Sequence, residues 1–175
     1  MLRRTLPAAL AALSLVLAAP PAYPEPAVGG GYLHPGHALL VAQTPLPYQP
    51  AGMDSGASLY LAAGDDAARG ALELGVLVFP GLTLGESYLD AGGFARVSAY
   101  RGDKGEMGLG LWLGPRVSLE YPDPPVTLTL GVGLGYYGGL YLGYGLGLRA
   151  YLEPAAVELG WDSDTGPYGA LLFLW

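Results

Sequence analysis

The segment 128–152 alternates between large apolar residues and small ones. Its even positions are almost all aliphatic or tyrosine, as at Leu130 and Leu142, and most of its odd positions are glycine. A period of two is the side-chain spacing of a β-strand, whose successive residues point to opposite faces. The alternation predicts two antiparallel strands joined by the three-residue turn Tyr137-Gly138-Gly139, each with a Leu-rich face and a Gly-rich face.

The same segment contains GLGYYG, Gly133 to Gly138, which matches the G-x-G-x-x-G fingerprint of dinucleotide-binding proteins. That fingerprint must open a helix, and here an alternating strand follows it instead. We therefore expect no nucleotide site. The formal net charge of −7 also argues against a nucleic-acid partner, since phosphate backbones repel acidic proteins.

The first residues have the layout of a secretory signal peptide. Arg3 and Arg4 precede an apolar run over 8–17, and small residues follow it. This run is too short for a transmembrane helix, which needs about 20 apolar residues. The sequence predicts a signal peptide at 1–18 and export from the cytoplasm.

The remaining chain combines high hydrophobicity with β-strand periodicity. Half of its residues are hydrophobic and 29 are glycine, yet no apolar run after the signal could span a membrane as a helix. A soluble barrel turns its apolar face inward and covers the outside with long polar side chains. Here the non-apolar face is mostly glycine, which is typical of a transmembrane barrel with leucine toward lipid. We expect a protein of the cell outer membrane, in contact with outer-membrane lipid.

The alternation continues through the chain and predicts an all-β fold, an eight-stranded antiparallel up-and-down transmembrane β-barrel over 56–175. A turn is expected at Phe79-Pro80-Gly81 and a β-bulge at Gly92-Gly93, where the apolar residues change from even to odd positions. The expected strands are 56–64, 69–79, 82–100, 106–121, 126–136, 140–152, 156–161 and 167–175.

A Pro-rich N-terminal periplasmic segment is expected at 19–55. Residues 20–50 hold half of the 16 prolines, and such a segment favours extended, loosely packed structure. It could also bind a periplasmic partner. Alternatively, 38–42 contributes a strand, which gives ten strands if 82–100 is a hairpin turning at Asp90 to Gly93.

An even-stranded exported barrel with an aromatic terminal residue resembles the small bacterial outer-membrane barrels of the opacity-protein and OmpA-transmembrane-domain type. The resemblance covers 56–175. It implies that Leu171, Phe173 and Trp175, at alternating positions of the last strand, act as an assembly signal for the barrel-assembly machinery.

The inward positions of the expected strands carry both charges and aromatic rings. An eight-stranded barrel has room inside only for side chains, so we expect a filled lumen in which opposite charges pair. The alternative is a gated pore or a small cavity in the Gly-rich external half. Tyr151 is expected to face Glu158. The expected lumen charges are Glu73, Arg96, Arg116, Glu120, Arg149 and Glu158, and the expected lumen aromatics are Trp112, Tyr141 and Tyr151.

Three aromatic residues lie at strand ends, on the even or odd positions that belong to the outward, apolar face of their strands: Tyr121, Tyr136 and Trp161. Aromatic residues of this kind gather at membrane–water interfaces, so these three are expected to be interfacial anchors.

The sequence offers no convincing catalytic set. Its two histidines, His34 and His37, flank a Pro-Gly pair typical of a turn, so no base is available inside the expected barrel. Asp162 to Gly166 resembles part of a calcium loop but lacks the distant glutamate of such a loop, so an ordinary Asp/Gly turn is expected. We expect a protein that is not an enzyme and has no cofactor. Its expected role is structural, anchoring or surface-interacting. The alternatives are a narrow channel or a carrier of small apolar molecules and, third, a secreted soluble barrel that binds ligands.

Overall fold

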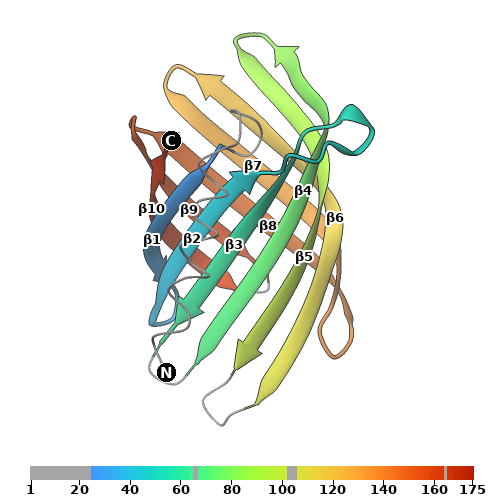
Figure 1. The fold of residues 1–175 in the computed structure, drawn as a ribbon, viewed down its shortest axis with the longest axis vertical. Helices are drawn as coiled ribbons and strands as arrows, with labels where there is room; N and C mark the ends of the chain where they lie inside the picture. Colours follow the sequence, from blue (N-terminus) through green and yellow to red (C-terminus); the bar gives the residue numbers. More distant parts are fainter. Residues whose placement is uncertain (1–24, 65–66, 102–105, 164) are drawn as a thin grey trace.

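The computed structural model describes residues 25–64, 67–101, 106–163 and 165–175. Ten antiparallel strands in these residues form one closed barrel in which each strand pairs with the next and β1 pairs with β10 (Figure 1). No helix among the described residues is long and apolar enough to cross a membrane. The strands are β1 Ala27–Leu33, β2 His37–Pro45, β3 Ser55–Ala63, β4 Ala68–Leu84, β5 Ser87–Arg101, β6 Met107–Pro122, β7 Pro125–Tyr136, β8 Leu140–Tyr151, β9 Ala155–Asp162 and β10 Gly166–Leu174.

The strand number is that of the ten-strand alternative, and the expectation of eight is wrong. Both additional strands, β1 and β2, come from the Pro-rich segment, so the barrel begins at Ala27 and not at residue 56. The prolines of this segment flank the strands: Pro35 lies in the β1–β2 turn and Pro45 ends β2. Proline is tolerated at strand ends, so its abundance did not exclude strands. The expected signal peptide, 1–18, lies outside the described residues.

Glycine explains why β1 shows no alternation. A Cβ atom on Gly29 would lie 1.9 Å from the carbonyl oxygen of Leu171, and one on Gly31 would lie equally close to that of Gly169. The backbones of β1 and β10 therefore approach too closely for side chains at these two positions. Glycine at this seam lets the sheet close, and it removes the periodicity that identifies a strand.

The β4–β5 hairpin turns later than expected. β4 continues through Phe79-Pro80-Gly81 to Leu84, and the turn is Gly85-Glu86. The register of β4 against β5 shifts between Leu77 and Leu82, so the Pro-Gly pair marks an irregular stretch inside β4. β5 pairs with β6 without interruption through Gly92-Gly93, so neither the expected bulge nor the expected turn lies in β5 there; the register shift opposite Gly92 adds its extra residue to β4. Because the turn has two residues, an even position of β4 pairs with an odd position of β5, and the apolar residues therefore change from even to odd positions between the two strands.

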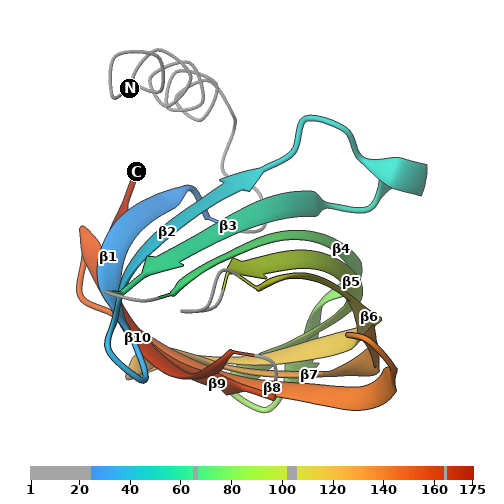
Figure 2. The same cartoon turned by 90° about the horizontal axis from the view of Figure 1, so that it is seen from below.

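The barrel is flattened, as the view along its length shows (Figure 2). β1 to β5 form one side and β7 to β10 the other. We call the end where β10 finishes the proximal end; it also holds the β2–β3, β4–β5, β6–β7 and β8–β9 turns. The opposite, distal end holds the turns beginning at His34, Gly64 and Tyr137 and the β9–β10 connection.

Inside the barrel, an apolar core occupies the side formed by β10, β1 and β2. Leu33, Leu39, Val41 and Leu172 are buried there, with alanines from β3, β9 and β10 between them. The charged side chains lie elsewhere in the lumen, so the interior is apolar toward this seam and polar across its middle.

Candidate functional site in the barrel lumen

A network of buried charges crosses the middle of the lumen. The guanidinium of Arg96, on β5, contacts Glu73 Oε2 on the neighbouring β4, with Nη2 at 2.9 Å and Nε at 3.0 Å. Its Nη1 lies 2.7 Å from Asp162 Oδ2 on β9, on the opposite side of the barrel. Arg116 Nη1, on β6, donates to Glu73 Oε1 at 2.6 Å. Two cations and two carboxylates thus neutralise one another, as buried charges must.

Aromatic rings surround this network. Trp112 is 2% exposed, and its ring centroid lies 4.9 Å from the guanidinium carbon of Arg96 and 4.8 Å from the ring of Phe94. Tyr60 lies 5.7 Å from the same guanidinium carbon. A Cβ atom on Gly143 would lie 2.9 Å from the indole of Trp112, so the glycine face of β8 provides the space that this ring occupies.

A second charged group lies between the network and the proximal end. Arg149 on β8 forms an ion pair with Glu158 on β9, and its Nη2 donates to Gln43 Oε1 on β2 at 2.7 Å. The Tyr168 hydroxyl donates to Glu158 Oε1 at 2.9 Å. The residue facing Glu158 is Arg149; Tyr151 faces Ala156, so the expected Tyr151–Glu158 pairing is wrong. The β8–β9 register is shifted by two residues from the expected one.

Two cavities flank the charge network, one toward each end of the barrel. The proximal cavity is about 680 Å³ and the distal cavity about 600 Å³. The lumen is therefore filled at its centre only, because ten strands enclose a wider interior than eight. Four residues line both cavities and separate them; we call this set the plug: Tyr60, Arg96, Asp162 and Tyr168.

The proximal cavity holds most of the charged side chains of the lumen. Gln43, Ser58, Ser118 and Thr129 line it together with the charged groups already described. Glu120 lies near its mouth, where its electrostatic neighbours are the carboxylates of Asp90 and Glu25 and not an arginine. The expected neutralisation by a paired cation therefore does not extend to Glu120.

The distal cavity is mainly apolar and aromatic. Leu33, Leu39, Ala62 and Ala71 line one side, and all four are buried. Tyrosines supply much of the remaining wall: Tyr60, Tyr100, Tyr137, Tyr141 and Tyr168. The rings of Tyr100 and Tyr137 pack with their centroids 5.1 Å apart, and Gly135 leaves room for the Tyr141 ring, which a Cβ there would meet at 2.2 Å.

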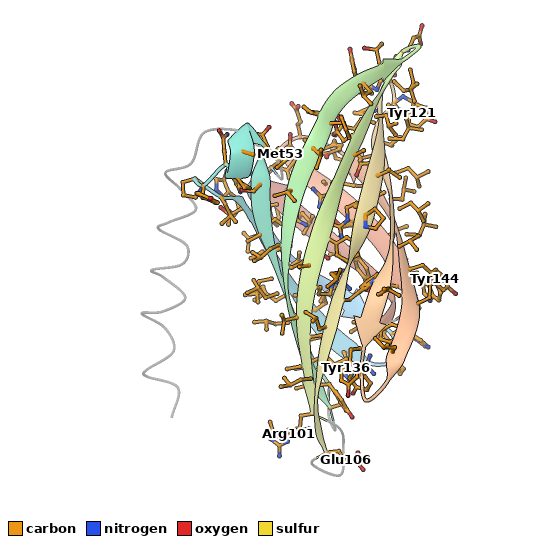
Figure 3. All side chains as sticks on the ribbon, turned by 90° about the vertical axis from the view of Figure 1, so that its right-hand side faces the viewer. Met53, Arg101, Glu106, Tyr121, Tyr136 and Tyr144 are labelled. Carbon is orange, nitrogen blue, oxygen red and sulfur yellow. The ribbon has the colours of Figure 1, made fainter. Side chains whose placement is uncertain are left out.

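Two of the three outward aromatics lie near the ends of the barrel, and Trp161 does not. Tyr121 lies at the proximal end and Tyr136 at the distal end (Figure 3). Trp161 lies on the outer surface near the distal end of β9 and packs against Tyr144 with ring centroids 4.8 Å apart. Leu171 and Phe173 on β10, and Trp175 directly after it, are exposed.

Sequence reasoning missed several residues that the fold brings into the lumen. Asp162 was read as a turn residue, although it has the same parity as Glu158 on the same strand. Its Oδ1 also accepts a hydrogen bond from the Thr165 backbone N–H at 2.6 Å, so it serves the turn and the lumen together. Tyr60 was also missed, although it lies between Leu59 and Leu61, whose side chains are exposed on the outer face. Gln43 was missed because β2 was assigned to the leader.

The histidines do not form a metal site with other described residues. His34, Pro35 and Gly36 connect β1 to β2, and His37 is buried at the start of β2. Within the described ranges no group of three histidine, cysteine, aspartate or glutamate side chains is arranged to hold a metal ion.

Searches of known protein families, of curated proteins and of solved structures find no match to this chain.

Proposed function

We propose that this chain is an outer-membrane β-barrel protein with a lumen closed at its centre and a structural, anchoring or surface-interaction role. Lipid would surround its outer wall. The charged and aromatic plug would prevent free passage between the two cavities, so the protein would hold its ends at the two membrane surfaces without acting as an open channel.

One observation carries this proposal: the distribution of charge and apolar surface between the two faces of the wall. Every strand exposes at least one large apolar side chain, and Leu109 and Leu142 are 73% and 67% exposed. The charged residues of the described strands line the lumen cavities, except Arg101 at the distal end of β5. A soluble barrel has the opposite distribution, and continuous apolar surface of this extent is not left open to water. A transmembrane barrel requires it.

The ends of the barrel support the same assignment. Tyr121 at one end and Tyr136 at the other are placed as interfacial girdles would be. In an outer membrane, the exposed residues Leu171 and Phe173 of β10 and the following Trp175 would be presented to the barrel-assembly machinery. The β2–β3 loop projects from the proximal end and exposes Tyr48, and it is the part of the Pro-rich segment that a periplasmic partner would meet.

The narrow-channel alternative requires the plug to open. The Arg96 bridges join β5 to both β4 and β9, and Arg96, Glu73 and Asp162 are all 8% exposed or less. Breaking such a buried pair is strongly unfavourable, so the closed lumen is the resting state that this geometry supports.

The test begins with the protein without its expected signal peptide, refolded into detergent and lipid vesicles. A folded membrane barrel should migrate differently on a semi-native gel when unheated and when boiled, and it should stay with vesicles after an alkaline wash. In a planar bilayer the inserted protein should give no steady conductance. A protein that stays monomeric in buffer without detergent would favour the secreted soluble barrel, and stable ion currents would favour the channel.

A further inference from the structure

We propose that the distal cavity is a binding site for one uncharged amphiphile: a flat aromatic molecule that carries a hydroxyl or carbonyl oxygen at one end. The inference deepens the proposed function and rests on it, since a wall facing lipid leaves the lumen as the place where the barrel can select a ligand.

The size and lining of the cavity fit such a molecule. A volume of about 600 Å³ lies within the range of roughly 300–1,000 Å³ that is usual for small-molecule sites. Buried leucine and alanine side chains form one side, and tyrosine rings form much of the rest. Flat aromatic ligands gain from offset or edge-to-face contacts with such rings.

Tyr60 supplies a polar group at the floor. Among the described residues its hydroxyl makes no hydrogen bond, although its ring packs edge-on against Tyr168, with centroids 6.4 Å apart, and lies beside Arg96. The Tyr168 hydroxyl, by contrast, donates to Glu158. Tyr60 is thus placed to donate to a ligand oxygen at the base of the site.

The charges around the cavity favour an uncharged ligand. The Arg96 guanidinium and the Asp162 carboxylate in its floor already pair with each other. Arg69 reaches from β4 across to the β9–β10 connection, where its Nη1 lies 3.4 Å from the Thr165 carbonyl oxygen. A carboxylate at this floor would meet a cation and an anion that already neutralise each other, and burying a charge without a partner of its own is costly.

The site can be tested with two matched probes, 9-anthracenemethanol and 9-anthracenecarboxylate, titrated calorimetrically into barrel-loaded lipid nanodiscs with empty nanodiscs as the reference. The neutral alcohol should bind saturably at one molecule per barrel, and the carboxylate should bind at least tenfold more weakly. No saturable uptake of the alcohol would overturn the site. Tighter binding of the carboxylate would overturn the assignment of an uncharged ligand.

Three variants locate the binding. Ala71→Phe fills the cavity beside Tyr60 and should weaken binding of the alcohol at least tenfold, whereas the matched Ala95→Phe lies on an outward position and should leave it unchanged. Tyr60→Phe removes only a hydroxyl and should weaken binding about fivefold. Equal affinities in all three variants would place the probe outside the distal cavity.

The heat shift of each variant on the semi-native gel separates the two proposals. A barrel that inserts into nanodiscs but takes up no alcohol contradicts the binding site alone. A chain that does not insert and remains soluble contradicts the membrane assignment, and the same titration in buffer then tests the site by itself.

Discussion

Arg96 and Asp162 face each other across the barrel, with Nη1 of the arginine 2.7 Å from Oδ2 of the aspartate. The two residues belong to β5 and β9, which are not neighbours in the sheet. This contact joins the two sides of the flattened barrel at the level where the proximal and distal cavities meet. It is therefore the contact on which closure of the lumen depends most directly.

Shortening Arg96 should connect the two cavities. In Arg96→Ala the guanidinium that lines both of them is lost, and the inserted barrel should show discrete conductance steps in a planar bilayer where the unmodified protein shows none. Arg149→Ala is the matched control, because Arg149 lines the proximal cavity and is not part of the plug. This variant should show no conductance steps. If neither variant conducts, the tyrosines of the plug close the lumen without Arg96.

The same contact should dominate the stability of the lumen. Arg96→Met keeps much of the side-chain volume but leaves Asp162 buried without this cation, and we expect the free energy of unfolding to fall by about 3–5 kcal/mol. The double variant Arg96→Met/Asp162→Leu removes both charges and should recover a large part of that loss. Urea unfolding in lipid vesicles, analysed as a double-mutant cycle, measures the coupling. Additive losses would show that the two side chains do not interact as the structure has them.

Closure of the sheet should depend on the glycine face of β1. A Cβ atom on Gly31 would lie 1.9 Å from the Gly169 carbonyl oxygen, whereas one on the adjacent Gly30 has its nearest atom at 3.4 Å. Gly31→Ala should therefore separate β1 from β10 and abolish the heat shift on a semi-native gel, and Gly30→Ala should retain it. A retained shift in Gly31→Ala would show that β1 is not required for the barrel.

The alternation of apolar residues between even and odd positions was enough to predict how the middle strands pair. It predicted the three-residue turn Tyr137-Gly138-Gly139, which pairs Tyr136 with Leu140, and the structure has this pair. This prediction succeeded because shifting a strand by one residue against its neighbour would turn its outward side chains into the lumen, so only one register keeps the apolar residues outside.

The alternation did not predict strands in which the residue types required by the local structure interrupt it. In β1 the glycines that permit close approach to β10 also erase the alternation. In β4 the Pro80-Gly81 pair has the composition of a turn but lies within an irregular strand pairing. The contact of Arg96 with Asp162 could not be read from spacing, because pairs across the lumen depend on how the whole sheet closes.

The outward face provides the strongest test of the membrane assignment. Leu130 lies in the middle of β7 with its side chain exposed, so Leu130→Arg places a charge where lipid is expected and should lower the free energy of unfolding in vesicles by about 2–4 kcal/mol. Leu130→Phe is the apolar control and should change it by less than about 1 kcal/mol. A soluble barrel would respond in the opposite way, because a charge at an exposed position faces water and reduces aggregation. Unchanged stability of Leu130→Arg together with higher solubility would therefore reverse the assignment of the two faces.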